Sequence, residues 1–379
     1  MKILFIGHAY VSAWHQEKIT ALTNYKDIEL SLITPTWWEE GLRKVSAAKQ
    51  SDAPFDFYSV KAFFIGKQYL HFYRGLSRYL KSIDPDILHI EEEPNSVACY
   101  QIMKLKKRLK LRAKTVMVTC ENIIHTWEFP NPRYFLYPFC QRYTLRNFDH
   151  IITSPQRGKE VILNKGFNGP ITYIPQLGTN PDKFKKMNAD NLREKIGLNG
   201  FTIGYAGRLL KMKGLDTLIR AFANIKQSCQ LLLVGDGPER LALENLARSL
   251  SIRDKIFFVN GVSHEELPLY FNCMDVFVLA SERTKNWQEQ FGRVLMEAMS
   301  CEVPVVGSTC GEIPYTMADA GLLFKEGSEK DLQLKLEEVM ENQALRKELA
   351  RSGRQRVLSH FTHDIIAKKT YEVYCGLLK

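Results

Sequence analysis

The sequence predicts an α/β protein made of two doubly wound domains that face each other across a deep cleft. Three observations lead to this prediction. The 379 residues suit two domains at roughly 150 residues each. Short apolar runs alternate with longer amphipathic stretches, which is typical of parallel sheets covered by helices on both faces. The pattern breaks over residues 175–192, where Pro, Gly, Asn and Asp gather, so we expect a domain boundary there.

In the first half, each expected strand is a short run of β-branched, aromatic or other apolar residues, beginning with KILFI just before Gly7. The expected strands are 2–6, 29–33, 87–90, 115–119, 150–153 and 171–174. Between them, apolar residues recur at helical spacing over 67–82, 95–110 and 134–147. We therefore assign residues 1–180 to the first domain.

The second half repeats this alternation without repeating the sequence. The expected strands are 201–206, 231–234, 255–259, 275–280 and 303–306, separated by helical patterns at 214–226, 238–250, 264–272 and 293–300. From about 328 to 377 only helical patterns remain. We assign residues 181–360 to the second domain and 361–379 to a C-terminal helix that packs back on the first.

The composition excludes several classes of protein. Hydrophobic residues make up 45% and charged residues 25%, which is ordinary for a soluble globular chain. No apolar run approaches the ~18 residues that span a bilayer, and the N-terminus is too short in apolar residues for a signal peptide. The eight cysteines are scattered with no C-x-x-C pair, which disfavours zinc and redox motifs and suits a reducing compartment. We therefore expect a cytoplasmic protein.

A candidate anion-binding loop follows the strand 201–206. Gly207 and Arg208 come directly after that strand, and Lys213 and Gly214 precede the next helix. Free backbone N–H groups and the helix dipole favour a phosphate at such a helix start, and the two cations can neutralise it. The alternative is a solvated basic loop with a turn glycine. The pattern is neither G-x-G-x-x-G nor a Walker loop, which counts against a nicotinamide enzyme or a P-loop NTPase.

A second candidate element contains two acids, Glu289 and Glu297, on either side of Gln290, Phe291 and Gly292. We expect a helix to start near Gly292 and the two carboxylates to face roughly one side. A carboxylate that accepts protons from vicinal hydroxyls is a common way to hold a ribose or hexose. The alternative is a pair of solvated acids on a helix face.

These elements belong to a longer series that resembles glycosyltransferase family 4. The segments are GRLLKMKG, LLLVGDGPER, NGVSHEELPLYFNCMDVFVLAS, EQFGRVLMEAM and VPVVGS, in this order. The resemblance is specific over about 200–325 and covers the N-terminal domain only in general layout. It implies the GT-B architecture of two Rossmann-like domains. It also implies an enzyme that transfers a sugar, with retention, from a nucleotide-sugar to a glycan or lipid-linked acceptor in polysaccharide or glycolipid synthesis.

The resemblance also implies roles for the residues of the donor side. Arg208 and Lys213, carried by the Gly207 loop, resemble the pair that neutralises the leaving diphosphate, and such fixed cations stabilise the charge that develops there. Glu289 resembles the acid beside the donor sugar. The remaining implied donor-binding residues are Val262 at the nucleobase, Gln290, Phe291 and Gly292 at the sugar or phosphate, and Glu297 at the ribose. No Asp-x-Asp cluster occurs, so neither a metal nor a cofactor beyond the donor is expected.

The N-terminal domain departs from the family pattern. Many relatives carry a His after the strand that corresponds to 115–119, where this chain has Glu121. We expect Glu121 to be catalytic. Gly7 falls where the fold approaches the donor phosphates. The residues expected on the acceptor side are Glu91, Glu92, His125 and His8. The alternatives are a solvated acidic loop at 91–93 and a surface or capping role for His125.

The net charge of +10 is concentrated in the first half. Residues 1–180 carry 24 Lys and Arg against 16 Asp and Glu, and seven of those cations lie within 104–114. This segment is either the basic end of a helix or a docking patch for an anionic membrane. The aromatic pairs Trp37–Trp38 and Phe63–Phe64 are candidates to join such a patch. No nucleic-acid motif accompanies the charge, so we expect no nucleic-acid partner, and a peripheral association with the inner face of the plasma membrane stays open beside the helix-end interpretation.

Two rival functions stay open at this point. One is a nucleotide-sugar epimerase of GT-B architecture, which needs an acid and a base in the cleft. The other is a non-catalytic partner that only binds a nucleotide-sugar. The presence of Arg208, Lys213, Glu289 and Glu297 together argues against the second rival.

Overall fold

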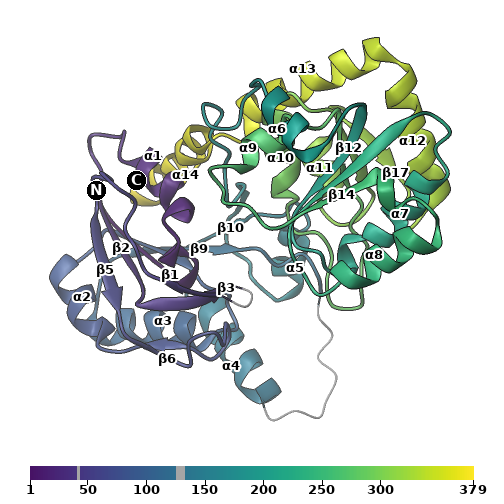
Figure 1. Ribbon diagram of the computed structural model, residues 1–379. Coiled ribbons are helices and arrows are strands. Elements are labelled where there is room, and N and C mark those ends of the chain that lie inside the picture. The colour runs from purple at the N-terminus through teal and green to yellow at the C-terminus, as the bar shows by residue number, and fades with distance from the viewer. Residues whose placement is uncertain (41–42, 125–132) are drawn as a thin grey trace. The chain divides into compact units, whose positions relative to one another are not determined.

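A computed structural model describes residues 1–40, 43–124 and 133–379 (Figure 1). The chain forms two compact units. The first unit contains Met1–Gly178 and His363–Lys379, and the second contains Thr179–Thr362. The C-terminal helix is therefore part of the N-terminal unit.

The first unit is built on a seven-stranded parallel sheet with the strand order β11-β10-β9-β8-β1-β2-β5. Its strands are β1 (Lys2–Gly7), β2 (Glu29–Pro35), β5 (Asp56–Val60), β8 (Ile87–Glu91), β9 (Lys114–Thr119), β10 (His150–Thr153) and β11 (Ile171–Tyr173). Two short antiparallel pairs lie outside this sheet, β3 (Trp37–Glu40) with β4 (Arg43–Ser46) and β6 (Ala62–Phe63) with β7 (Phe72–Tyr73).

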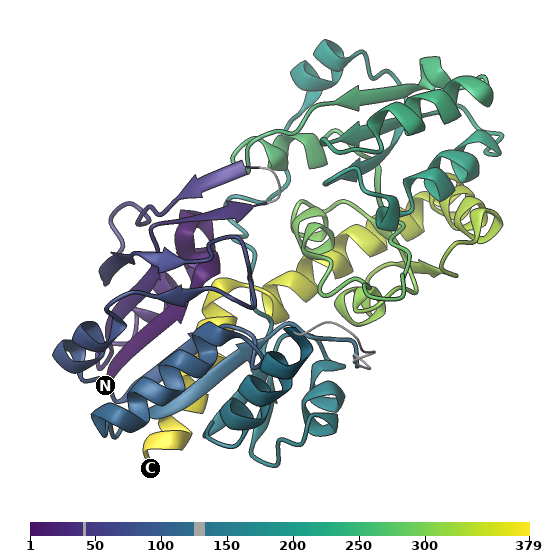
Figure 2. The ribbon, with the colours of Figure 1, turned by 90° about the horizontal axis from the view of Figure 1, so that it is seen from below.

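Helices cover both faces of this sheet because successive strand residues point to opposite sides. Leu4, Leu88 and Met117 belong to one buried cluster with α2 (Leu76–Ile83) and α3 (Val97–Leu109). Phe5, Ile87 and Val118 belong to the other cluster, with α1 (Glu17–Leu22) and α14 (His363–Leu378). The unit also contains α4 (Arg133–Leu145) and α5 (Gly158–Asn164). Figure 2 shows α14, in yellow, running along this sheet.

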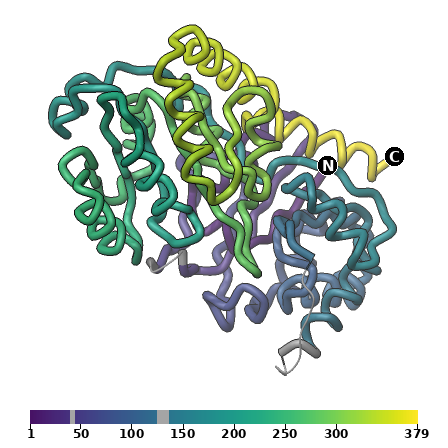
Figure 3. The backbone as a smooth tube through the Cα atoms, turned by 90° about the vertical axis from the view of Figure 1, so that its right-hand side faces the viewer, coloured from purple at the N-terminus to yellow at the C-terminus, as the bar shows by residue number. Residues whose placement is uncertain are grey.

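The second unit is built on a six-stranded parallel sheet with the order β14-β13-β12-β15-β16-β17. Its strands are β12 (Phe201–Ala206), β13 (Cys229–Val234), β14 (Ile256–Val259), β15 (Val276–Leu279), β16 (Val305–Ser308) and β17 (Leu322–Phe324). Its helices are α6 (Asp190–Ile196), α7 (Leu215–Ala223), α8 (Arg240–Ser249), α9 (Leu267–Phe271), α10 (Arg293–Ser300), α11 (Ile313–Met317), α12 (Glu329–Glu341) and α13 (Gln343–His360). The yellow-green α12 and α13 are consecutive and pack on α7 and α10 respectively (Figure 3).

The predicted pair of doubly wound α/β units is confirmed, and each expected strand is present within two residues at either end. Two expectations were wrong. The edge strands β5 and β17 were missed, because β5 is only partly buried and β17 has three residues. The helix expected over 67–82 begins only at Leu76, because the segment before it contains β7 and ends at Gly75 with φ +69°. Within the described residues, no helix combines the length and apolar character that a membrane span requires.

A buried polar contact joins α14 to the first sheet, and it gives a test of this packing. The Tyr374 hydroxyl donates to His89 Nδ1 at 2.6 Å, and both residues are buried. Replacing Tyr374 by Phe leaves the His89 nitrogen without its donor, so we expect a loss of about 1–3 kcal/mol in the free energy of unfolding. Urea denaturation measures it. Tyr371→Phe, whose hydroxyl contacts the exposed Asp27, is the matched control, and equal effects of the two variants would contradict the buried contact.

Candidate active site

The donor-side residues gather at the topological switch point of the second sheet. From β12 the chain adds β13 and β14 on one side, and it adds β15, β16 and β17 on the other. The carboxyl ends of β12 and β15 therefore lie side by side while the segments that follow them diverge, and this is where open α/β sheets bind their ligands. Arg208 and Lys213 follow β12, and Glu289 follows β15.

Glycines bring the backbones of these loops unusually close. Gly207 has φ +148° and Gly235 has φ +142°, and a Cβ on Gly235 would lie 1.9 Å from the carbonyl oxygen of Gly207. Gly214, with φ +60°, begins α7, and a Cβ there would lie 2.1 Å from the carbonyl oxygen of Ala280. No side chain larger than hydrogen fits these positions without moving the backbone. The loop that carries the two cations is therefore pressed against the loops after β13 and β15.

Lys213 and Glu289 meet in this arrangement. The Lys213 ammonium lies 2.6 Å from Glu289 Oε2 and 4.9 Å from the centre of the Trp287 ring. Ser281, just after β15, donates its hydroxyl to the same carboxylate at 2.7 Å. The Glu289 carbonyl accepts from the backbone of Glu312 at 3.0 Å. Glu289 is buried, so its charge is fixed in place by these partners rather than by water.

Arg208 differs from Lys213 in being exposed. Its carbonyl accepts from the Tyr205 hydroxyl at 2.9 Å, which fixes the backbone, while its guanidinium makes no ion pair with any residue in the described ranges. Because the backbone is anchored and the guanidinium has no ion-pair partner, Arg208 can donate two parallel hydrogen bonds to a bound anion.

Glu289 and Glu297 lie on either side of the helix start expected near Gly292, and both are buried, so a pair of solvated acids is wrong. Gly292, with φ +67°, precedes α10, which begins at Arg293, so Glu289 lies in the loop before the helix. Glu297 is on the helix and buried. The positive φ that a glycine supplies at position 292 separates the two acids into different local environments.

Glu297 is held by one of its two oxygens. Arg293 Nε lies 2.7 Å and His264 Nε2 lies 3.1 Å from Glu297 Oε1, whereas no hydrogen bond from the described residues reaches Oε2. Lys183 donates to the other nitrogen of that imidazole at 3.2 Å. Sequence reasoning missed His264. The signal available was its place two residues after Val262, in the loop that follows β14.

The other expected donor residues line the same edge of the sheet. Val262 is half-buried against the core of the unit, and Gln290 is exposed. Phe291 packs edge-on against Phe361, with ring centres 6.1 Å apart, and its carbonyl accepts from the Thr316 hydroxyl at 2.7 Å. The backbone N–H groups at the start of α10 are what this segment offers an anion.

In the first unit, the three successive acids that begin with the last residue of β8 are all buried, with 6%, 1% and 9% exposure, so a solvated acidic loop is wrong. Glu91 is bound by Lys18, by His89 Nε2 at 3.1 Å and by Gln176 at 3.2 Å. Burial raises the pKa of Glu91, but Lys18 and His89 outweigh it and hold that pKa below its usual range. These contacts give Glu91 a structural role between the sheet and α1.

Glu93 and Glu121 follow the adjacent strands β8 and β9. Thr119 donates to Glu93 at 2.6 Å, and Lys165 forms an ion pair with Glu121. Burial and the neighbouring carboxylate of Glu121 raise the pKa of Glu93 to about 8. Lys165 pairs with Glu121 and offsets only part of this rise, so the Glu93 carboxyl keeps its proton to a higher pH than an ordinary glutamate.

The remaining predicted residues of this unit fall in two places. Gly7 has an extended backbone, and a Cβ there would lie 3.1 Å from the Tyr10 ring. His8 and Glu92 are in direct contact. His125 lies outside the described residues.

The proton on Glu93 predicts a pH effect on stability. The unfolded carboxyl ionises above a pKa of about 4.3, whereas the folded one stays protonated until about pH 8. Stability contributed by this group is therefore lost as pH rises between these values. We expect Glu93→Gln to flatten the decline in melting temperature from pH 5 to pH 8. Glu348→Gln, at an exposed site, is the control, and an unchanged slope in Glu93→Gln would refute the buried proton.

Comparisons with known proteins can now be set beside this geometry. Residues 188–356 match the family described as glycosyl transferases group 1. Over 244 residues the chain is 29% identical to the capsular polysaccharide biosynthesis glycosyltransferase CapM of Staphylococcus aureus, which covers 60% of this chain and 61% of that protein. Over 163 residues it is 34% identical to the GDP-mannose-dependent alpha-(1-6)-phosphatidylinositol monomannoside mannosyltransferase of Mycolicibacterium smegmatis, which covers 40% of this chain and 42% of that protein. The chain therefore matches at most about three fifths of these relatives.

The whole fold has a counterpart among solved structures. Anabaena Alr3699/HepE in complex with UDP superposes over 99% of this chain and 100% of its own, with a TM-score of 0.76 and 18% identity. At this identity the likeness concerns the fold.

Proposed function

We propose that this protein transfers a sugar from a nucleotide-sugar to a glycan or lipid-linked acceptor, in polysaccharide or glycolipid synthesis, because residues 188–356 match the family described as glycosyl transferases group 1. One observation carries the proposal: the loops that follow β12 and β15 at the switch point of the second unit hold the Lys213–Glu289 ion pair and the exposed guanidinium of Arg208. CapM and the mannosyltransferase are named for polysaccharide and glycolipid synthesis, which supports these two classes of product.

The chemistry follows from the charges of this site. Breaking the bond between the anomeric carbon and the diphosphate builds positive charge on the sugar and negative charge on the diphosphate. Arg208 and Lys213 neutralise the diphosphate, and the N–H groups of Phe291 and Gly292 add fixed dipoles. Glu289 holds Lys213 in place and lies beside the sugar. Because two protein cations supply the charge, we propose that the step needs no metal and no cofactor.

Recognition of the nucleoside is assigned to the neighbouring loops. Glu297 Oε2, which the Arg293 and His264 contacts leave open, accepts the ribose hydroxyl protons. The backbone at Val262 meets the base, and Gln290 binds the sugar. Glu297 thus binds Arg293 and His264 with Oε1 and binds the ribose with Oε2.

The first unit is assigned to the acceptor. Glu92 and His8 line that site, and Glu121, beside Lys165, stands in for the histidine that related enzymes carry after the corresponding strand. Glu91 is dropped from this set because Lys18, His89 and Gln176 occupy its carboxylate. We propose that the configuration at the anomeric carbon is retained, on the resemblance of the second unit; the proton NMR spectrum of the first-formed product tests this.

Substituting the exposed guanidinium tests the transfer function. Arg208→Ala is expected to lower turnover about 10²–10³-fold, the usual cost of removing one fixed donor to developing charge, with an unchanged melting temperature. Donor consumption with a panel of nucleotide-sugars measures it, and Lys226→Ala, another exposed cation of the unit, is the control.

The same panel separates the rivals. A transferase slowly hydrolyses one donor, an epimerase interconverts two, and a binding partner does neither. Full turnover by Arg208→Ala would remove the diphosphate role.

We also propose that the first unit docks on the anionic inner face of the plasma membrane, which makes the protein a peripheral cytoplasmic one. Lys107, Arg108 and Lys110 are exposed at the end of α3. On the neighbouring α4, Phe139 is 57% exposed, and its ring centre lies 5.5 Å from that of Tyr100. Exposed Phe63 and Phe64 remain candidates, whereas Trp38 is 7% exposed and is not available.

Neutralising the basic end of α3 tests the docking. The triple change of Lys107, Arg108 and Lys110 to Gln removes about 1 kcal/mol of membrane attraction per cation. Binding to phosphatidylglycerol vesicles in a sedimentation assay should therefore weaken about 100-fold. The same change at Lys195, Lys226 and Lys255, exposed in the second unit, is the charge-matched control. Equal binding by the two triple variants would exclude this surface.

A further inference from the structure

His8 and Glu92 join the two strands that flank the switch point of the first sheet. From β1 the chain adds β2 and β5 on one side, and from β8 it adds β9, β10 and β11 on the other. His8 comes directly after β1, and Glu92 comes directly after β8. Ligands of open parallel sheets bind at this place. The protonation of His8 and Glu92 therefore decides which hydrogen bonds they can offer a ligand.

Glu92 is a buried carboxylate that receives four hydrogen bonds. His8 donates its backbone N–H at 3.0 Å and its Nδ1–H at 2.7 Å. His71 Nε2 lies 3.1 Å and the Tyr73 hydroxyl 3.0 Å from Glu92 Oε1. Burial raises the pKa of Glu92, but the two imidazoles outweigh it and hold that pKa below its usual range. The carboxylate is therefore ionised and accepts every one of these bonds.

His71 must carry a proton on both nitrogens. Its Nε2 faces the Glu92 carboxylate, and its Nδ1 faces the Gln68 carbonyl at 3.1 Å. Neither oxygen can donate, so each nitrogen has to. Burial lowers the pKa of His71, but the facing carboxylate more than offsets it and the pKa is raised. His71 and Glu92 thus form a buried ion pair that is neutral as a whole.

His8 is left with one ring nitrogen that no protein hydrogen bond uses. Its Nδ1 donates to the carboxylate, so the lone pair of the neutral tautomer is on Nε2. Nε2 contacts nothing among the described residues, and the side chain keeps 15% of its surface exposed. The Trp38 ring packs against the imidazole, with centres 4.4 Å apart, and restricts its rotation. A tautomer fixed by a carboxylate, with the second nitrogen open, is a prepared hydrogen-bond acceptor.

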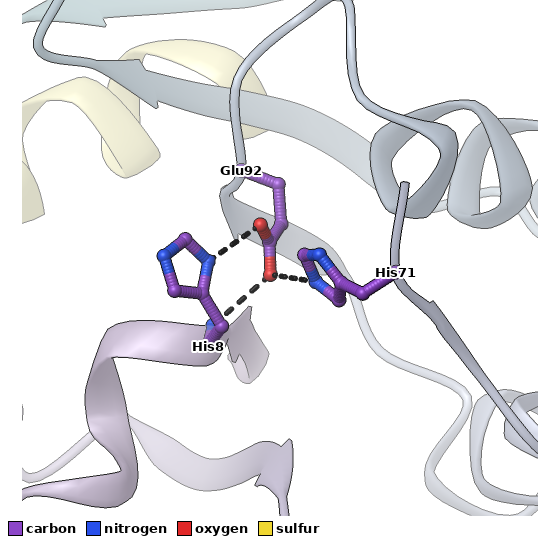
Figure 4. Close-up of side chains that lie close together, drawn as sticks. All are labelled: His8, His71 and Glu92. Atoms are coloured by element: carbon purple, nitrogen blue, oxygen red, sulfur yellow. Dashed lines mark hydrogen bonds and ion pairs between the residues drawn. The ribbon is translucent and has the colours of Figure 1, made fainter. Parts of the chain in front are cut away.

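A metal site is the other arrangement that these residues suggest, since their ligand atoms lie within 4.8 Å of one another. Figure 4 shows the Glu92 carboxylate between the two imidazole rings, each ring approaching it from its own side. An ion bound by all three would take the Glu92 carboxylate as a ligand and replace the protons between it and the two imidazoles. The hydrogen bonds account for every contact without an ion.

We propose that His8 Nε2 accepts a hydrogen bond from a hydroxyl of the sugar acceptor, with Glu92 and His71 as the positioning pair that fixes its tautomer. This inference rests on the proposed transferase function. It predicts that the sugar acceptor places a hydroxyl group at the switch point of the first unit, where that hydroxyl donates a hydrogen bond to His8.

Selective ¹⁵N labelling of histidine tests the charges directly. In the full chain at pH 7, we expect the NMR signals of His71 to be those of an imidazolium and the signals of His8 to be those of the Nδ1–H tautomer. His71→Asn and His8→Gln assign the signals. In Glu92→Gln, His71 should lose its proton. A neutral His71 in the unsubstituted protein, or a shift of both rings on adding Zn²⁺ alone, would overturn the assignment.

Carbethoxylation by diethyl pyrocarbonate tests the open nitrogen, because the reagent attacks an unprotonated imidazole. Mass mapping should show modification at His8 but not at the buried His71, with exposed His360 as the internal reference. Octyl β-D-glucopyranoside, a soluble probe rich in sugar hydroxyls, should protect His8 in a saturable manner and leave His360 unaffected.

An unmodified or unprotected His8 would refute the hydroxyl role. Neither experiment uses a nucleotide-sugar, so such a result leaves the transfer chemistry standing. Conversely, failure of every donor in the turnover assay would remove the transferase function while these measurements still report the state of His8.

Discussion

The close approach of backbones around Gly207, Gly214 and Gly235 is the constraint on which the proposed donor site depends. It draws the loop after β12 against the loop after β15, so that Lys213 reaches Glu289 at 2.6 Å. A cation and a carboxylate fixed in this way need little reorganisation when a diphosphate departs, and fixed charges of this kind are the most effective form of electrostatic catalysis. Larger side chains at the glycines would separate the two halves of the site.

The first unit is constrained differently, because it buries three consecutive acids, Glu91, Glu92 and Glu93. Each acid has its own partners: Lys18 and His89 for Glu91, His8 and His71 for Glu92, and Thr119 for a protonated Glu93. A buried charge without a partner is costly, so these sets make the switch point rigid. The same pairing leaves one imidazole nitrogen of His8 available to a ligand.

The two units therefore use their switch points in complementary ways. The second presents cations and helix N–H groups, which suit an anionic leaving group, whereas the first presents an open acceptor nitrogen, which suits a hydroxyl. This division follows from charge alone and agrees with the roles that the family resemblance implies for donor and acceptor.

Local information determined the fold class and the donor motif, because strand and helix periodicity and the order Arg208, Lys213, Glu289 and Glu297 are properties of the sequence. The edge strands β5 and β17, by contrast, bury too few residues to leave a clear apolar run. Only the tertiary structure paired Glu92 with His8 and His71, residues 84 and 21 positions away, and Glu297 with His264. Such partners are chosen by sheet order and by the need to neutralise buried charge, and neither is encoded at short range.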